Sequence, residues 1–408
     1  MTDQSPKAPF LARVERGALC AGCGGCAALS GGAITMQRSD AGLLRPRQSA
    51  PIDAKTDRAI AAICPGLGQT VVAGGRTDDV VWGPYVSMQT GWASDAALRH
   101  RASSGGALSA VMVHLLQTGA VDGIVQTEAD PDNPMGNRTV ISRDTETVLQ
   151  SAGSRYAPSA PLAGIMPLLD GTERFAFVGK PCDVAALRAL ERDDARVAER
   201  FPVMLSFFCA GVPSLQGAAG ILRALEVAET DLDRVRYRGQ GWPGQATATL
   251  KDGSERSMSY FESWGRILSH HVQHRCKICA DGAGAAADVV CADAWKADEN
   301  GYPLFEEEDG ISLVVARTEK GAALIAAAEA AGTLVLDGFD VADLRGIQKG
   351  QLWRRRLLSA RLAALRLMGK PVPRYEGLQV RAVARLAGRR ERLRNFIGMI
   401  KRVLRGRM

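Results

Sequence analysis

The spacing of the cysteines constrains the fold of this 408-residue chain more than any other feature of its sequence. Thiols act as metal ligands where several of them can reach one point, and six of the nine cysteines fall into three short motifs. A run of three is followed, after a gap of 37 residues, by a Cys-Pro dipeptide, so a loop has to bring the fourth thiol back to the first three. The motifs are Cys20-x2-Cys23-x2-Cys26, Cys64-Pro65 and Cys276-x2-Cys279.

The first four thiols predict a 4Fe–4S cluster. A CxxCxxC run places three ligands on one loop, and a proline stiffens the turn that carries the fourth, as in ferredoxins of the bacterial type. Structural zinc also takes four cysteines, but usually as two CxxC pairs, so the triple run favours an iron–sulfur cluster over zinc. Glycine and alanine surround the thiols, which allows the backbone to wrap a cluster and aim amide groups at its sulfurs.

A second cluster is indicated by Cys276 and Cys279, which supply two ligands and need two more from distant parts of the chain. Cys182 and Cys209 each follow a predicted strand, which places them at the edge of an α/β sheet where ligands gather. The alternative is that both are ordinary buried thiols, and spacing alone does not decide between the two. We interpret His274 as a structural or solvent-facing side chain rather than a ligand.

Strand-like and helix-like stretches alternate between residues 85 and 350, and this alternation predicts a mixed α/β (α+β) core. We divide the chain into a ferredoxin-like iron–sulfur segment over residues 1–80, the core over residues 81–350 and a basic helical tail over residues 351–408. The expected strands cover residues 121–125, 174–178, 203–208 and 311–316, and a helix is expected over residues 106–117.

The sequence contains no run of 18 apolar residues, and its first residues lack the apolar core of a secretory signal. These observations predict a cytoplasmic protein. In the reducing cytoplasm, clustered cysteines are metal ligands or redox groups more often than disulfides.

Positive charge is concentrated at the C-terminal end. Residues 351–408 contain 17 lysines and arginines and two glutamates, a net charge of +15, whereas the whole chain carries +7. Apolar residues between Leu393 and Leu404 recur at helical spacing among basic ones, which predicts a basic amphipathic helix. Three interpretations stay open: a solvated helix, a docking site for an acidic ferredoxin-like electron donor, or a helix on an anionic membrane surface. Nucleic acid is not expected as a partner, because no aromatic residues or reading motif accompany the charge.

The sequence Ser103-Ser104-Gly105-Gly106 precedes the expected helix and is a candidate phosphate site. Glycine lacks the Cβ that would block approach, and amide groups at a helix N-terminus bind oxygen atoms together with serine hydroxyls. An ordinary helix cap is the alternative.

Together these motifs resemble the coenzyme F420 hydrogenase/dehydrogenase beta-subunit family. The matching stretches follow the family order and span about residues 15–350. There are two departures: Cys291 stands where the family commonly has glycine, so we treat it as a non-ligand, and the tail beyond residue 350 matches nothing. Besides the CxxCxxC run and residues 103–106, the stretches are Ser154-Arg155-Tyr156, Gly179-Lys180-Pro181-Cys182-Asp183, Phe208-Cys209, Arg236 to Gly244, Cys276 to Asp281, Ala287-Asp288-Val289 and Asp293-Ala294-Trp295.

The resemblance implies an FAD-dependent oxidoreductase with iron–sulfur clusters. The family includes deazaflavin-reducing subunits of hydrogenase and formate dehydrogenase, and ferredoxin-dependent reductases of chlorophyll metabolism. The resemblance also implies that Cys182 and Cys209 join Cys276 and Cys279 in holding a second 4Fe–4S cluster. The residues that it places near the flavin are Ser103, Ser104, Gly105, Gly106, Arg155, Tyr156, Lys180, Arg238, Gly239 and Trp242.

Iron–sulfur clusters pass single electrons, and a flavin combines two of them, so FAD and two clusters suit reduction of a small organic substrate. Lys180 is the predicted catalytic residue, because an ammonium group beside the flavin would stabilise negative charge on the reduced ring. Its alternative roles are a surface lysine or a helix-cap partner. Three function classes follow. The two ligand sets in one chain of 408 residues favour a stand-alone reductase with a ferredoxin-like donor. The alternatives are an electron-transfer beta subunit with a hydrogenase- or dehydrogenase-type partner and, more remotely, a zinc-stabilised binding protein.

Overall fold

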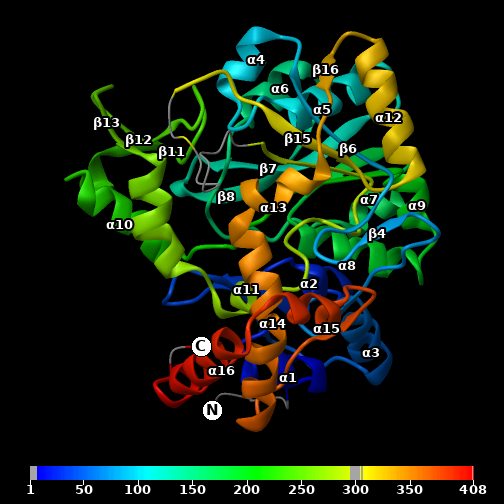
Figure 1. Cartoon of the computed structure of the whole chain (residues 1–408), viewed down its shortest axis with the longest axis vertical. Coiled ribbons are helices and arrows are strands. Elements are labelled where there is room, and N and C mark those ends of the chain that lie inside the picture. Colours follow the sequence, from blue (N-terminus) through cyan, green and yellow to red (C-terminus); the bar gives the residue numbers. More distant parts are fainter. Residues whose placement is uncertain (1–6, 295–303, 305–306, 407) are drawn as a thin grey trace.

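The structure is a computed structural model that describes residues 7–294, 304, 307–406 and 408. An eight-stranded sheet runs through its centre in the order β16-β6-β15-β14-β10-β9-β7-β8 (Figure 1). Its four middle strands, β14, β10, β9 and β7, are parallel, and antiparallel strands extend the sheet at both ends. In chain order the strands are β6 (Ser87–Ala93), β7 (Gly123–Asp130), β8 (Asn133–Ser142), β9 (Phe175–Val178), β10 (Val203–Phe207), β14 (Val289–Asp293), β15 (Ser312–Ala316) and β16 (Leu334–Asp337).

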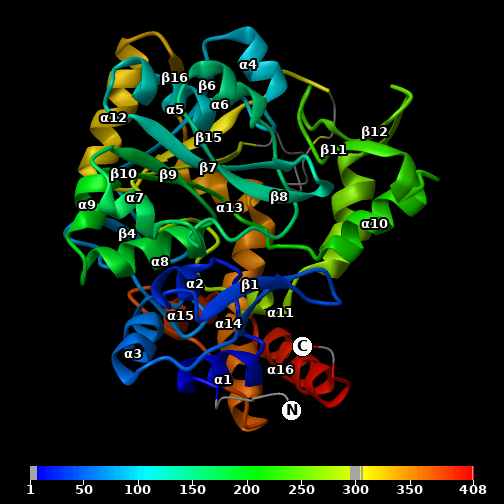
Figure 2. The same cartoon turned by 180° about the vertical axis from the view of Figure 1, so that it is seen from behind.

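The parallel strands are apolar on both faces because helices cover both faces of the sheet (Figure 2). In β9, Phe175 and Phe177 face one helical layer, whereas Ala176 and Val178 face the other. The predicted α/β core is therefore confirmed, although β7 continues five residues beyond its predicted end. The first layer contains α7 (Met166–Asp170), α8 (Pro181–Glu191) and α9 (Arg196–Arg200), and the second contains α5 (Ala107–Gln117), α6 (Thr145–Gln150) and α12 (Glu319–Ala330).

A smaller antiparallel sheet forms a lobe beside the central sheet, on the left in Figure 1. The buried side chains of Tyr237 and Leu268 lie in its core. The loop that contains Gly241 to Gly244 connects two of its strands. The lobe consists of α10 (Leu215–Ala224), β11 (Leu232–Arg236), β12 (Gln245–Leu250), β13 (Glu255–Ser259), η2 (Phe261–Ile267) and η3 (Leu268–His271).

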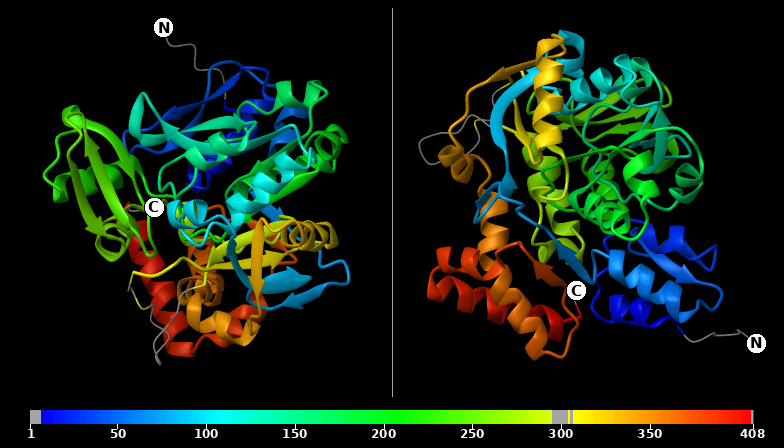
Figure 3. Two further views of the ribbon diagram at one scale, coloured as in Figure 1. Left: turned by 90° about the horizontal axis from the view of Figure 1, so that it is seen from above. Right: turned by 90° about the vertical axis from the view of Figure 1, so that its right-hand side faces the viewer.

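The two terminal segments pack together at one end of the molecule, although the whole core separates them in the sequence (Figure 3). Strand β17 (Arg374–Glu376) of the tail pairs in parallel with β3 (Gly68–Thr70), which follows the Cys64 turn. The N-terminal segment contains α1 (Pro9–Arg16), α2 (Gly25–Leu29), β1 (Ile34–Arg38), β2 (Leu44–Gln48) and α3 (Ala54–Ile63), and the tail contains α14 (Lys349–Leu367), α15 (Val380–Val383), η5 (Ala384–Leu386) and α16 (Arg389–Leu404).

The tail is helical, as predicted, but it is not an exposed extension. In α14, Leu358 and Leu365 are at most 1% exposed, because they pack against the N-terminal segment. The arginines of the same helix do not require open solvent, since Arg354 and Arg361 donate hydrogen bonds to backbone carbonyls of the core and Arg355 donates to that of Leu378 within the tail. The tail therefore joins the two cysteine-bearing parts of the molecule.

Helix α16 matches the predicted amphipathic helix, but the structure divides its apolar side chains into two groups. Phe396 and Ile400 pack against the body of the protein. Leu393, Ile397 and Leu404 face outward, with exposed fractions of 59%, 42% and 71%.

Short elements complete the fold. None of the helices in the described ranges is long and apolar enough to cross a bilayer. The short elements are β4 (Thr77–Asp79), β5 (Gly83–Tyr85), α4 (Ala96–Arg101), η1 (Glu229–Asp231), α11 (His274–Lys277), η4 (Val341–Asp343) and α13 (Leu344–Ile347).

Candidate functional site

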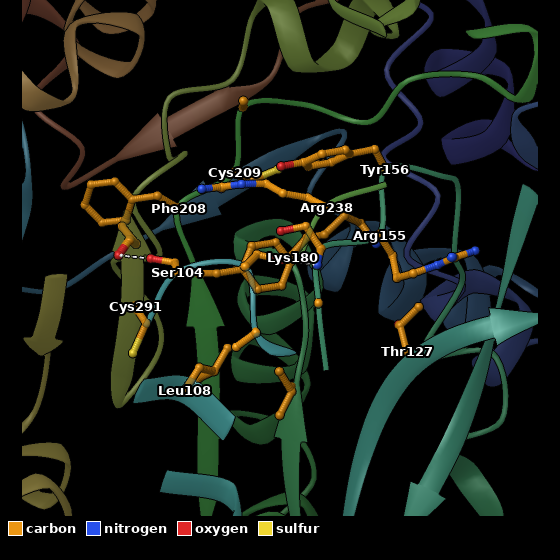
Figure 4. Close-up of a pocket in the computed structure, with 18 of the residues that line it drawn as sticks. Ser104, Leu108, Thr127, Arg155, Tyr156, Lys180, Phe208, Cys209, Arg238 and Cys291 are labelled. Atoms are coloured by element: carbon orange, nitrogen blue, oxygen red, sulfur yellow. Dashed lines mark hydrogen bonds between the residues drawn. The ribbon is translucent and has the colours of Figure 1, made fainter. Parts of the chain in front are cut away.

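A pocket opens at the edge of the central sheet where the parallel strands β9 and β10 end (Figure 4). Its volume is about 320 Å³, within the range of small-molecule sites. Ligands bind at this edge in α/β sheets, because loops and helix N-termini converge there. Of the residues that the family resemblance places near a flavin, Ser103, Ser104, Gly106, Arg155, Tyr156, Lys180 and Arg238 line the pocket, whereas Gly105, Gly239 and Trp242 do not.

Helix α5 begins at the pocket with uncapped backbone amides. Gly105 and Gly106 have φ angles of 67° and 74°, which glycine adopts without strain, and they turn the chain into the helix. Neither serine caps the helix: the hydroxyl of Ser103 accepts from the backbone N–H of Ser154, and that of Ser104 donates to a carbonyl of β14. The first amides of α5 are therefore suited to bind a phosphate or another oxyanion.

The guanidinium of Arg155 forms hydrogen bonds with backbone carbonyls. Its guanidinium donates to the carbonyls of Gly136 and Val235, both at 2.6 Å, and points away from the centre of the pocket in Figure 4. Burial lowers its pKa from the ordinary value. Arg155 thus shapes the wall of the pocket, and the neighbouring Tyr156 lies with its ring centroid 4.8 Å from that of Trp264.

Arg238 forms a bidentate ion pair with Asp293, with N–O distances of 2.8 and 2.7 Å, and the indole of Trp242 donates to the same carboxylate. Arg238 is 2% exposed, and its guanidinium carbon lies 4.7 Å from the ring centroid of Tyr260. Burial lowers the pKa of Arg238, but Asp293 more than compensates and raises it. Burial also raises the pKa of Tyr260 well above its ordinary value. Trp242 therefore acts on the pocket by positioning Arg238 and Asp293.

Lys180 places a buried ammonium group in the pocket wall. Its Nζ lies 2.7 Å from Oδ2 of Asp183 and 2.9 Å from the hydroxyl of Ser159, and the two charged side chains are 8% and 1% exposed. Asp183 also accepts the backbone N–H of Lys180 at 3.0 Å and so caps α8, the alternative role expected from the sequence. Burial lowers the pKa of Lys180, but Asp183 and the thiol of Cys182 raise it above the ordinary value. The side chain is consequently cationic at neutral pH.

The first four predicted ligands converge in the N-terminal segment. All are free, half-buried thiols, and electrostatic interactions connect them to one another. Backbone N–H groups of Gly22 and Gly25 donate to two of the sulfurs, and burial raises the pKa of every thiol in the set. A Cβ on Gly66 would lie 2.5 Å from the carbonyl oxygen of Leu19, so the turn requires glycine there. We call Cys20, Cys23, Cys26 and Cys64 the first cysteine set.

The other four converge where α8, β10 and α11 meet. Electrostatic interactions connect Cys209 with Cys276 and Cys279, and Cys182 with Cys209 and Cys276. The backbone N–H of Val212 donates to the sulfur of Cys276 at 3.4 Å. Cys209 also lines the pocket, so this set borders it directly. We call Cys182, Cys209, Cys276 and Cys279 the second cysteine set.

No three histidine, cysteine, aspartate or glutamate side chains in the described part of the chain are placed to hold a single metal ion. The thiolates of a 4Fe–4S cluster bind four different iron atoms, so the relevant comparison is with four thiols around a larger group. Each set provides four thiols with amide donors nearby, and this donor chemistry fits such a cluster. Cys291 lines the pocket without an electrostatic link to either set, and burial alone raises its pKa to about 12.

Arg275 interacts with both cysteine sets, a role that no sequence motif predicted. It is 2% exposed and donates to the carbonyl of Pro65 at 2.6 Å, which ties α11 to the turn carrying Cys64. It interacts electrostatically with Cys20 and Cys64 of the first set, and with three cysteines of the second. Burial lowers the pKa of Arg275, but its surroundings, led by Tyr375, raise it. A permanent positive charge therefore separates the two sets.

Hydrogen bonds from the tail also fix the backbone that carries the second cysteine set. Arg354 donates to the carbonyls of Cys209 and Ala210 at 2.7 and 3.1 Å, and Gln351 donates to that of Cys209 at 3.0 Å. Arg361 donates to the carbonyl of Lys277 at 2.8 Å. The sequence could not reveal these residues, because arginines that bind carbonyls and arginines that face water follow the same helical pattern.

Comparisons with known proteins agree with this architecture. Residues 88–166 match the family model for the coenzyme F420 hydrogenase/dehydrogenase beta subunit N-terminus, and residues 172–341 match the model for its C-terminus. The matched segments include the central sheet almost completely and the second cysteine set. The first cysteine set precedes them and the tail follows them. Trp295, part of one family motif, lies outside the described residues.

Individual relatives are distant in sequence. The coenzyme F420 hydrogenase subunit beta of Methanococcus voltae is 25% identical over 72% of this chain and 99% of its own length. The chloroplastic 7-hydroxymethyl chlorophyll a reductase of Oryza sativa subsp. japonica is 21% identical over 55% of this chain and 46% of its own length. A chain from the F420-reducing NiFe hydrogenase complex of Methanosarcina barkeri shares the fold, with a TM-score of 0.51 and 20% identity over 69% of this chain and 95% of that chain.

Proposed function

The chain belongs to the coenzyme F420 hydrogenase/dehydrogenase beta-subunit family, and from this membership and the pocket we propose that it is a redox subunit that binds FAD and two 4Fe–4S clusters. One observation carries the proposal: Cys209 belongs to the second cysteine set and also lines the pocket. A group held by that set would border on a ligand in the pocket. Electron transfer between the two would then need no further cofactor.

Residues of the chain match the needs of each group. The cysteine sets would each hold one cluster, the uncapped amides of α5 would receive the diphosphate of FAD, and Lys180 would lie near its ring system. When bound, the clusters would supply single electrons, and FAD would deliver them in pairs to a small organic acceptor. Lys180 would then stabilise negative charge, because Asp183 and Ser159 fix its position before any reaction occurs.

The relatives favour a beta subunit over a stand-alone reductase. The hydrogenase subunit is matched over 99% of its length, whereas the chlorophyll reductase is matched over 46%. We therefore propose a hydrogenase- or dehydrogenase-type partner as the electron donor and a deazaflavin coenzyme as the acceptor. A stand-alone reductase with a ferredoxin-like donor is the second candidate, because both cysteine sets are present in one chain.

The first test is to purify the protein without oxygen and to count iron, acid-labile sulfide, zinc and flavin per chain. Two clusters and one flavin require about eight iron atoms and one FAD. Cys209→Ala should reduce iron to about four atoms, because it removes one ligand of a single cluster. Cys291→Ala is the matched control, since Cys291 lines the same pocket and belongs to neither set. Zinc in place of iron, with no flavin, would overturn the proposal.

A second measurement separates the two candidate functions. Coenzyme F420 and reduced viologen are added to the isolated protein, and the absorbance of the coenzyme is followed. Reduction of the coenzyme supports the beta-subunit function. Reduction of an unsaturated organic substrate by reduced ferredoxin, with coenzyme F420 unchanged, supports the stand-alone reductase.

A further inference from the structure

A second cavity lies apart from the flavin pocket, between α16, the η3–α11 segment and the N-terminal segment. Its volume is about 600 Å³. One wall consists of residues 398–405 and Met408, which follow the last residue matched by the family models. No function proposed above uses this cavity.

The lining of the cavity is strongly basic. No acidic residue is among the described residues that line it, and no described carboxylate forms an ion pair with its lysines or arginines. Positive charges from three segments of the chain therefore converge without an acidic side chain to neutralise them. The basic residues are Arg45, His270, His274, Lys277, Lys401, Arg402 and Arg405.

The charges are close enough to repel one another. Arg402 interacts electrostatically with Lys277 on α11 and with Arg361 on α14. Such convergence creates a local positive potential that attracts a group of opposite charge. A bound anion would supply that charge, and one with several charges would contact more than one wall.

His274 provides an independent indication of a ligand. Its side chain is 7% exposed, and its Nε2 is buried without a hydrogen-bond partner among the described residues. Buried polar atoms are nearly always hydrogen-bonded, so an atom without a partner at the wall of a cavity indicates a missing hydrogen-bond partner. In the tautomer that carries a proton on Nε2, this partner is an acceptor. An oxyanion would accept this bond while lying against the cations of α16.

We propose that this cavity binds an anion that carries two or more phosphate groups. Lysine and arginine together suit phosphate oxygens, because arginine offers a fork of donors and lysine a compact charge. The same phosphate chemistry occurs in soluble polyphosphate compounds and in the head groups of anionic phospholipids. Leu393, Ile397 and Leu404 are exposed on the same helix, so both sources are tested below. The proposal does not depend on the flavin or on iron.

The test measures binding of inorganic tripolyphosphate to the anaerobically purified protein by isothermal titration calorimetry. The double variant Lys401→Gln/Arg402→Gln should bind at least tenfold more weakly, and added KCl should weaken binding to the unchanged protein. Arg389→Gln is the control, since Arg389 is exposed at the start of the same helix and does not line the cavity. All these side chains are exposed, so thermal unfolding should change little.

The second arm of the experiment uses flotation with vesicles that contain cardiolipin, an anionic lipid with two phosphates, with phosphatidylcholine vesicles for comparison. Flotation with the anionic vesicles that is lost in the double variant and kept in Arg389→Gln identifies lipid as the source of phosphate. Tripolyphosphate binding without flotation identifies a soluble ligand. The proposal is wrong if neither probe binds below about 1 mM, or if the double variant binds both as the unchanged protein does. Iron and flavin content are measured in parallel, so loss of the redox groups is distinguished from loss of this site.

Discussion

The ion pair between Lys180 and Asp183 gives the most direct prediction from the structure. Both side chains are buried, at 8% and 1% exposure, and their charged atoms lie 2.7 Å apart. Lys180→Met leaves the carboxylate of Asp183 buried, and the backbone N–H of residue 180 is then its one hydrogen-bond donor among the described residues. Removing one partner of a buried pair typically costs about 3–5 kcal/mol, so we expect a loss of unfolding free energy in that range.

The reverse change has an additional cost. Asp183→Leu leaves the ammonium of Lys180 with the hydroxyl of Ser159 and also removes the cap of α8, which is worth about 1 kcal/mol. The double variant Lys180→Met/Asp183→Leu removes both charges and loses only the cap. It should therefore be more stable than either single variant, with a coupling energy above about 2 kcal/mol.

Urea unfolding of the anaerobically purified variants measures these differences, with Lys320→Met as the control for an exposed lysine. Flavin content and the rate of flavin reduction are measured on the same samples. We expect Lys180→Met to lower the rate, because the cation that faces the pocket is lost. A stability loss under about 1 kcal/mol would refute the energetic argument, and unchanged flavin content and rate would refute the catalytic role.

Three further predictions follow from other buried groups. Arg275→Gln should lower the reduction potential of both clusters, because it removes a cation beside each cysteine set. A potentiometric titration followed by EPR measures the two potentials. Arg374→Gln is the control, because Arg374 is exposed. Arg354→Gln should lower iron content, because the loop that carries Cys209 loses two hydrogen bonds. Arg366 is exposed, so Arg366→Gln should keep its iron. Equal iron in both variants would contradict a role of Arg354 in holding this loop. Burial lowers the pKa of His114, so the unfolded chain takes up a proton near pH 6.5 that the folded one resists, and stability is lost as pH falls below that value. His114→Leu should lack this loss between pH 7 and 5, as compared by thermal unfolding.

The sequence predicted the central sheet well because its signals are local. Short apolar runs such as Phe175 to Val178 are typical of strands buried on both faces, and helices do cover both faces here. The start of α5 was also predictable, since two glycines before an apolar run mark a sharp turn into a helix. Local signals were not sufficient to group the cysteines into two sets, because only the fold brings Cys182 and Cys209 to the CxxC motif of α11.

The roles of long-range partners were not predictable from the sequence. Trp242 and Gly239 stand in a motif that resembles a flavin site, yet the indole is buried against Asp293, fifty-one residues away along the chain. Arg275 follows a histidine and precedes a cysteine, and nothing in that context shows that its guanidinium reaches Pro65. Each case depends on a contact between distant segments, and periodicity and spacing carry no information about such contacts.

The basic tail shows how this limit affects experiments. Its net charge of +15 is typical of a docking element, and a truncation before Gln351 is the direct test of that function. The structure shows that such a truncation would also remove Arg354 and Arg361, which hold the carbonyls of the second cysteine set, and β17, which pairs beside the Cys64 turn. Loss of activity after truncation would therefore not identify a docking site. The docking question is confined to α16, whose lysines and arginines bind no carbonyl or carboxylate in the described part of the chain, whereas its Glu391 pairs with Arg356 of α14. Substitutions of these cations test docking without disturbing the cysteine loops.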